Sequence, residues 1–258
     1  MTMFAGLDVG FKRTAICVVD ERGAIVWRGI VDTHPQALSA ALRRWQERLA
    51  KVGLETGSLS PWLARELAAG GFAVVCMDAR RAADAVKSRR VKTDKADALA
   101  LAEMLRTGWY SAVHVKSEES HKLKALLGAR DQLVRAKRAL GNQVRGLLRP
   151  FGIKLASRQG TKKFAEAAYG AVRHDAMLHT SVTALMEALA AIESQIARLD
   201  DQLKELARRS SVGWRLMSVP GVGPITALAF MAAIEDVGRF GRMRDIAVYL
   251  GLTPKRYQ

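Results

Sequence analysis

The hydrophobic pattern of the chain changes near residue 110, and this change limits the folds open to it. Before that point, short runs rich in β-branched residues alternate with amphipathic stretches of helical spacing. After it, leucines recur every seven residues, at Leu126, Leu133, Leu140 and Leu147. A seven-residue repeat keeps apolar side chains on one side of a helix. The sequence therefore predicts an α/β part followed by a long helical part.

The α/β part predicts a mixed β-sheet covered by helices. Strand-like runs occur at residues 3–10 and, as a pair joined by a turn at Glu21–Gly23, at residues 14–31. Two more runs, at 52–57 and 72–78, alternate with helical stretches at 35–50 and 60–70, and further helices are expected from about Ala79 and Asp94. Three strands in a meander followed by a strand–helix–strand alternation are typical of a mixed sheet.

Two long helices are predicted after residue 110. The first runs from roughly Ser117 to Arg149 and is ended by Pro150 and Gly152. The second carries apolar residues from Leu185 to Leu206 in alternating steps of four and three, which is the spacing of a coiled-coil seam. Two arrangements are open: an antiparallel pair within one chain, or a coiled coil between two chains.

A glycine turn precedes the last apolar helix, in the stretch SVPGVGPITALAF at residues 218–230. Gly221 and Gly223 permit positive φ angles and leave backbone N–H groups exposed at a helix N-terminus. A turn of this kind between two helices resembles a helix–hairpin–helix, which binds a phosphate backbone without reading sequence. A plain turn between two helices is the alternative.

The charge balance points to a polyanionic partner. The formal net charge is +16 and the pI is near 10.4, which favours nucleic acid through phosphate contacts. Cys17 and Cys76 both lie in apolar runs, so we expect buried thiols rather than a disulfide. No apolar run is long enough to span a bilayer. We expect a cytoplasmic, nucleoid-associated protein that makes no membrane contact.

Four carboxylates stand where a metal site could form. Asp94 and Asp97 lie three residues apart at the start of a predicted helix and therefore face the same way. Asp8 lies late in the first strand, and Glu55 ends a later one, each between glycines. Four acids that meet at strand ends need a compensating charge, and one or two Mg²⁺ ions would supply it. The ordinary roles are capping by Asp94, or by Thr93, and a helix-dipole contact by Asp97.

Basic residues accompany these acids. Two metal ions about 4 Å apart can activate one oxygen and stabilise the leaving one in phosphodiester displacement. Four cations just before the aspartate pair could hold a nucleic-acid backbone near such metals: Lys87, Arg89, Arg90 and Lys92. Three arginines on the first long helix are further candidates for nucleic-acid contacts: Arg135, Arg138 and Arg145.

These residues together resemble a known family. Asp8, Glu55 and the Asp94–Asp97 pair resemble the acids of the RNase H/RuvC-like nuclease fold. The chain more closely resembles transposases of the insertion-sequence-110 family, through GLDVGFKRTAICVVD, GLETG, KTDKADALALAEMLRTG, ARDQLVRAKRALGNQVRGLL, SVPGVGPITALAF and YLGLTPKRYQ. The resemblance implies DNA strand exchange, Mg²⁺ held by the four acids, a structured guide RNA as a further partner and homo-oligomers formed through the helical region.

The resemblance also implies three domains. They are a RuvC/RNase H-like DEDD domain at 1–110, a long helical coiled-coil region at 111–210 and a C-terminal transposase domain that starts at 211 and is incomplete at 258. The family pattern continues past Gln258 with a serine taken to be the nucleophile, so we expect this chain to lack it. Two other functions stay open: a non-catalytic nucleic-acid binder, and an actin-like ATPase or sugar kinase suggested by the Asp-x-Gly hairpin at Asp8.

Overall fold

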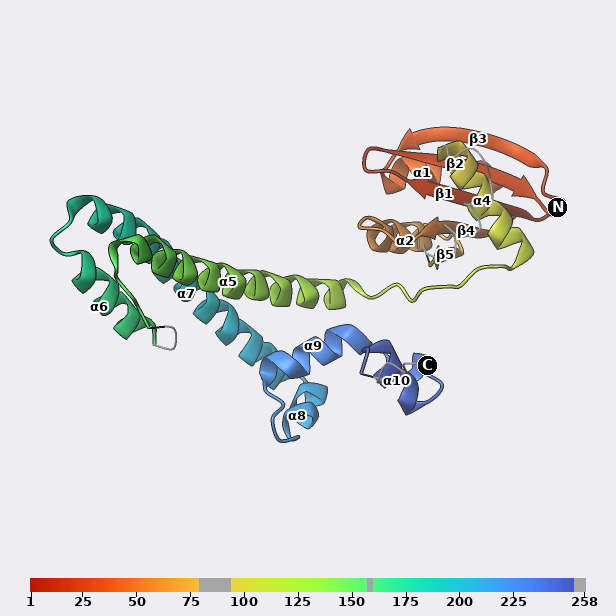
Figure 1. The fold of residues 1–258 in the computed structure, drawn as a ribbon. Coiled ribbons are helices and arrows are strands. Elements are labelled where there is room, and N and C mark those ends of the chain that lie inside the picture. The colour runs from red at the N-terminus through yellow and green to blue at the C-terminus, as the bar shows by residue number, and fades with distance from the viewer. Residues whose placement is uncertain (79–93, 157–159, 253–258) are drawn as a thin grey trace, which may run out of the picture. The chain divides into compact units, whose positions relative to one another are not determined.

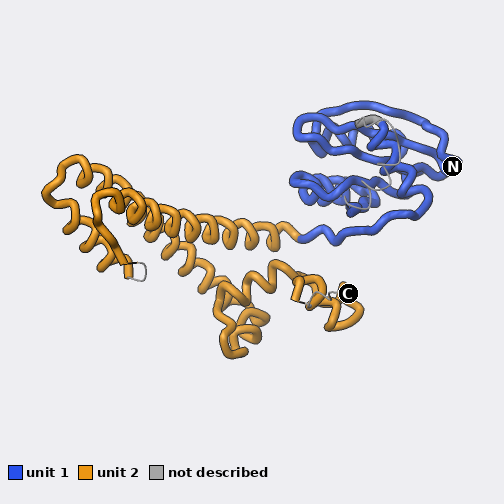
Figure 2. Tube along the Cα trace, viewed as in Figure 1, with its two compact units in different colours: residues 1–116 blue, residues 117–258 orange. Residues whose placement is uncertain are grey.

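The computed structural model describes residues 1–78, 94–156 and 160–252. Contacts between Cα atoms divide the chain into two compact units, Met1–Lys116 and Ser117–Gln258 (Figure 2). The predicted boundary at 210 falls inside the second unit, and the three-domain division stays a prediction. The helix expected from about Ala79 lies outside the described residues.

The first unit contains a five-stranded mixed sheet, as predicted (Figure 1). The order is β3-β2-β1-β4-β5, with β1–β2 and β2–β3 antiparallel and β1–β4 and β4–β5 parallel. The strands are β1 (Met3–Val9), β2 (Arg13–Asp20), β3 (Ile25–Asp32), β4 (Leu49–Glu55) and β5 (Val74–Met77). The β2–β3 turn forms because the carboxylate of Asp20 accepts the N–H groups of Arg22 and Ala24, at 2.9 and 2.8 Å.

Helices cover both faces of this sheet. Alternate residues of a strand point to opposite faces, so Ile16 and Val18 belong to one core and Cys17 and Val19 to another. The first core includes residues of α1 (Pro35–Leu42), the short 3₁₀ helix η1 (Arg43–Trp45) and α2 (Ser60–Ala69). The second core includes residues of α4 (Asp94–Thr107).

Helix α4 lies directly on glycines of the sheet. A Cβ atom at Gly6 in β1 would be 2.2 Å from the carbonyl oxygen of Ala98 and 2.4 Å from the amide nitrogen of Ala102. Gly53 in β4 is the register partner of Gly6, and a Cβ atom there would be 2.7 Å from Cδ1 of Leu105. Any side chain at Gly6 would therefore push the backbone of α4 away from the sheet.

A hairpin of two long helices, with a shorter helix between them, forms the first part of the second unit. It contains α5 (Glu118–Leu148), η2 (Arg149–Phe151), α6 (Thr161–Val172) and α7 (Ala176–Arg209). Helix α5 pairs antiparallel with α7, because Arg130 contacts Asp200 and Lys137 contacts Glu193, each at 2.5 Å, so that partner numbers fall along α7 as they rise along α5. Of the two arrangements that the sequence left open, the structure contains the antiparallel pair within one chain. Contact between chains through the helical region stays a prediction.

The two long helices begin at side-chain caps. Ser117 accepts the N–H of Ser120 at 3.2 Å, so α5 begins where the sequence predicts. Asp175 accepts the N–H groups of Met177 and Leu178, both at 3.0 Å, and α7 therefore begins at Ala176, nine residues before the first residue of the predicted seam, Leu185. None of the described helices is long and apolar enough to cross a membrane.

Short helices complete the second unit: α8 (Ser211–Met217), α9 (Pro224–Ile234), η3 (Val237–Arg239) and α10 (Met243–Tyr249). Of the two glycines in the α8–α9 turn, Gly221 takes a positive φ of 86°, whereas Gly223 has φ −88° and ψ 175°, which any residue adopts. Of these two glycines, which both permit a positive φ, only Gly221 adopts one. Helix α9 packs on the hairpin through Leu228, which lies in one core with Leu203 and Ala207.

We expect Gly6→Ala to destabilise the first unit by about 2 kcal/mol or more, because the new methyl group meets backbone atoms that only a shift of α4 can relieve. Urea unfolding of the full chain would measure this change. Gly57→Ala is the matched control, since no atom lies within 4 Å of a Cβ atom there. Equal unfolding midpoints for the two variants would contradict the close contact.

Leu203→Ala should lower the free energy of unfolding of the helical unit by roughly 2–5 kcal/mol, because this side chain is fully buried between the helices. Leu206→Ala removes the same atoms three residues later on α7, where the side chain is 38% exposed, and should cost about 0.5 kcal/mol or less. Circular dichroism at increasing urea would compare them. A larger loss from Leu206→Ala would mean that the intrachain seam is misplaced.

Candidate metal and nucleic-acid site

Two of the four predicted acids come together at the end of adjacent parallel strands. The register pairs Gly6 with Gly53 and Leu7 with Leu54, so the next residues, Asp8 and Glu55, lie beside each other. Side chains alternate along a strand, and these two acids therefore share the face on which the glycines contact α4. Neighbouring parallel strands are about 4.8 Å apart, which brings the two carboxylates close on one face.

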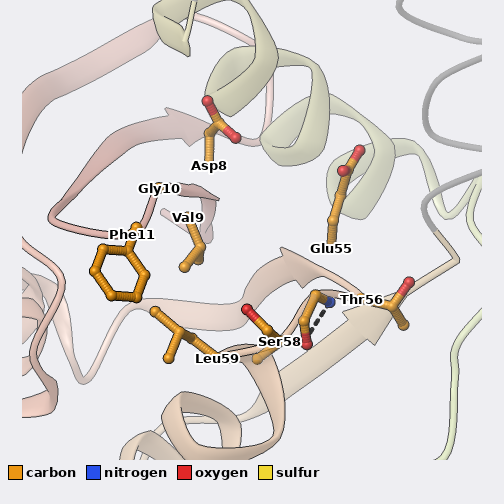
Figure 3. Close-up of a pocket in the computed structure, with 10 residues that line it drawn as sticks. Asp8, Val9, Gly10, Phe11, Glu55, Thr56, Ser58 and Leu59 are labelled. Atoms are coloured by element: carbon orange, nitrogen blue, oxygen red, sulfur yellow. Dashed lines mark hydrogen bonds between the residues drawn. The ribbon is translucent and has the colours of Figure 1, made fainter. Parts of the chain in front are cut away.

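A small pocket opens at this point. Its volume is about 140 Å³. It is lined by residues 8–11, at the end of β1 and in the loop after it, and by residues 55–60, which run from the end of β4 through a second loop to the start of α2. Figure 3 shows the side chains of Asp8 and Glu55 directed to the same side, beneath a helix. The second loop is held by Ser60, whose hydroxyl accepts the N–H of Gly57 at 2.6 Å and donates to its carbonyl oxygen at 2.7 Å.

Helix α4 brings its first turn to the same end of the sheet. A Cβ atom at Gly23, in the β2–β3 turn, would be 3.0 Å from Oε1 of Glu103, so the last turns of α4 lie at the far end from Asp8. Asp97 directly precedes Ala98, which contacts Gly6, and therefore lies toward the pocket end. Oδ1 of Asp97 is buried and has no hydrogen-bond partner among the residues that the structure describes.

An unsatisfied buried carboxylate oxygen is costly, since it loses its hydration without replacement. A cation at this position would remove the cost. The donor atoms available from Asp8, Glu55 and Asp97 are all carboxylate oxygens, which suit a hard cation such as Mg²⁺. Among the side chains that the structure describes, however, no group of three or more acids, histidines or cysteines lies close enough to hold one metal ion. The donors fit by type, and two of the four are brought together.

The fourth acid, Asp94, is the first residue of α4, which confirms that the pair lies at the start of a helix. Its side chain is outside the described part of the chain, as are four of the predicted nucleic-acid contacts, Lys87, Arg89, Arg90 and Lys92. Capping by Asp94 and metal binding by Asp94 both stay predictions.

The remaining predicted cations lie on α5, in the second unit. Arg135 pairs with Asp131 at 2.6 Å on the same helix. Arg145 packs on the ring of Phe164, with its Cζ 4.5 Å from the centroid, and donates to the carbonyl of Ala156 at 3.2 Å. Arg138 and Arg145 line a cleft of about 350 Å³ together with Lys137, which the sequence analysis did not single out. Basic side chains therefore gather on one face of the hairpin.

The sequence analysis also missed Phe11, whose side chain lines the pocket and is 83% exposed. The available signal was its position directly after Gly10, in a loop that follows Asp8. The two cysteines are free and buried, as predicted. Burial raises the pKa of both thiols, so neither is a candidate nucleophile at neutral pH.

Two family models match the chain. One, described as a transposase of the DEDD, IS110 type, matches residues 5–152, and the other, described as Transposase IS116/IS110/IS902 family, matches residues 214–258. A transposase for insertion sequence element IS1111A from Coxiella burnetii is 28% identical, over 98% of this chain and 68% of that protein. A probable family 20 transposase from Pseudomonas aeruginosa is 33% identical, over 98% of this chain and 74% of that one.

Similarity also extends to two proteins with other descriptions. A pilin gene-inverting protein from Moraxella bovis is 30% identical, over 66% of this chain and 44% of that protein. Among solved structures, Thermus thermophilus RuvC superposes on 43% of this chain and 100% of its own, with a TM-score of 0.30 and 17% identity.

Proposed function

The chain belongs to the IS116/IS110/IS902 family of transposases, and we propose that it binds DNA and Mg²⁺ for strand cleavage and exchange of an insertion sequence. Its first unit has an RNase H/RuvC-like mixed sheet, and its second is helical. The observation that carries the proposal is the placement of Asp8 beside Glu55, on the face where α4 supplies Asp97 with an unsatisfied carboxylate oxygen.

The roles of the acids follow from this placement. Asp8, Glu55 and Asp97 would hold the cation through carboxylate oxygens, and Asp94 joins them by its match to the family pattern. A bound Mg²⁺ supplies Lewis-acid stabilisation of the phosphodiester and activation of the attacking oxygen. The carboxylates neutralise the charge of the cation. They also set where a phosphate can approach, because they repel a phosphate wherever no cation lies between them.

Nucleic acid is the partner that the charge supports. With a net charge of +16, the chain as a whole attracts a polyanion. We assign backbone contacts to the α5 cations Arg135, Arg138 and Arg145, and to the N–H groups of the turn at Gly221 and Gly223. A structured guide RNA is a further partner implied by the family. Membership of a transposase family does not favour the actin-like ATPase alternative.

Mg²⁺ should raise the melting temperature of the full chain by several degrees at concentrations well above its Kd, because it binds the folded state alone. Asp8→Asn and Asp97→Asn should each remove most of this rise. Glu66→Gln is the matched control, since it removes one negative charge from an exposed position on α2 and should leave the rise unchanged. Thermal unfolding with and without Mg²⁺ would measure these shifts.

An unchanged Mg²⁺ effect in both aspartate variants would exclude the carboxylate site. A chain that binds DNA equally well with and without Mg²⁺, and never cleaves it, would instead be a non-catalytic binder.

Arg138→Gln should weaken binding to any duplex and reduce the slope of log K against log salt by about 0.9, the effect of losing one phosphate contact. Fluorescence anisotropy would give the slope if binding is measured between about 50 and 200 mM salt, the range over which affinity for DNA falls steeply. Arg22→Gln is the control, because this exposed arginine lies in the β2–β3 turn, at the end of the sheet opposite Asp8. Equal slopes for the two variants would remove Arg138 from the interface.

A further inference from the structure

Phe11 stands out among the residues of the pocket because it is large, apolar and 83% exposed. Single exposed apolar residues are common, and exposure alone indicates nothing. Three other features distinguish this ring: the rigidity of its loop, the residues beside it and its distance from the acids.

The loop that carries Phe11 is held on both sides by Thr33, the residue directly after β3. The Thr33 hydroxyl donates to the carbonyl oxygen of Gly10 at 2.9 Å, and its backbone N–H donates to the carbonyl oxygen of Lys12, also at 2.9 Å. Thr14 anchors that hydroxyl in turn, at 2.8 Å between the two Oγ1 atoms. The backbone before and after Phe11 is thus fixed, so binding a ligand on the ring costs little loop ordering.

Glycine is required at the start of this loop. A Cβ atom at Gly10 would be 2.5 Å from the carbonyl oxygen of Arg13, which accepts the N–H of Gly10 at 3.1 Å. The residue that follows this tight turn is Phe11, whose side chain is 83% exposed. The turn therefore presents the ring to solvent.

The surroundings of the ring match the parts of a nucleotide. Figure 3 shows Phe11 and Leu59 on the side of the pocket away from Glu55, so one side is apolar and the other acidic. Lys12 and Arg13 follow directly and are exposed. An aromatic face, adjacent cations and a carboxylate pair are what a base, its phosphate and a phosphate-bound cation require, respectively.

The distance from the acids fits the spacing of neighbouring nucleotides. Phe11 is three residues after Asp8, so their Cα atoms are at most about 11 Å apart. Successive bases along one strand of a duplex rise by about 3.4 Å. A base on the ring would thus belong to a nucleotide within about three steps of the phosphate at the acids.

We infer that Phe11 stacks on an unpaired base within about three nucleotides of the phosphate whose bound cation Asp8 and Glu55 would hold. In an intact duplex both faces of each base are covered by its neighbours, so a fixed ring can stack only where a face is free, as at a fork, a branch or a single strand. The substrate of this site is therefore DNA with a base outside the duplex stack. The inference rests on the proposed function and adds the class of substrate.

The test compares the full chain with three variants of Phe11, on two DNAs of equal length: an intact duplex and a fork with single-stranded arms. Phe11→Ala and Phe11→Leu should bind the fork roughly 5- to 150-fold more weakly, the range for loss of one stacked base. Binding to the duplex should change by less than about twofold, and Phe11→Trp should retain the wild-type preference because it keeps an aromatic face. These variants should fold, since the side chain is exposed.

Two further measurements separate stacking from other effects. A 2-aminopurine base at the fork junction should be quenched on binding by the wild type and by Phe11→Trp, but not by Phe11→Ala. Trp109→Ala, which removes another exposed aromatic ring just after the last turn of α4, should change neither affinity nor quenching. The salt dependence of fork binding should be the same in all variants, because no charge is altered.

Three results would overturn the inference: wild-type affinity for the fork in Phe11→Ala, wild-type affinity in Phe11→Leu, or equal losses on fork and duplex. If the wild type binds both DNAs and keeps its Mg²⁺ effect while Phe11→Ala matches it, the stacking role alone is wrong. If the wild type binds neither DNA at low salt, both the proposed function and the stacking role are wrong.

Discussion

The contact between α4 and the two glycines of the sheet is the constraint on which the candidate site depends. Gly6 and Gly53 are register partners, and the absence of side chains there lets the helix lie on the backbone of β1 and β4. Asp8 and Glu55 each lie two residues further along the same face. The contact that orients the helix thus also sets the distance between its first turn and the two strand-end acids, so packing and site geometry have one cause.

The acids at this site repel one another, and a bound cation would offset that repulsion. The chain carries 41 lysines and arginines against 25 acids, yet it gathers acids where two strands and a helix meet. Burial of an Asp97 oxygen without a partner adds to the cost. A destabilising group of acids in an otherwise basic protein is typical of a functional site, where some stability is lost so that a ligand can bind. A bound cation would balance the negative charge of the acids, and a phosphate would balance the positive charge of the surrounding side chains.

The structure confirms the predicted helices and strands whose positions depend on short-range sequence patterns. The start of α5 at Ser117 and the mixed sheet follow from capping chemistry and from strand-length apolar runs. The antiparallel pairing of α5 with α7 could not be chosen from the heptads, because the same seam serves within or between chains. In the structure, ion pairs between the two helices, such as Arg130 with Asp200, show how α5 is aligned with α7. The leucine seam from Leu185 does not show where α7 begins, because that position is set by the cap at Asp175.

The sequence by itself determined where most helices and strands lie, and it predicted which acids form the candidate site and that the partner is a polyanion, because each rests on residue type and short-range spacing. Only the tertiary structure decided that Asp8 stands beside Glu55, that α4 covers that face, and that Phe11 projects from a loop held by Thr33. These facts depend on strand register and on helix packing between residues far apart in the chain. No local periodicity encodes them, since a shift of one residue in register would place the same acids on the opposite face.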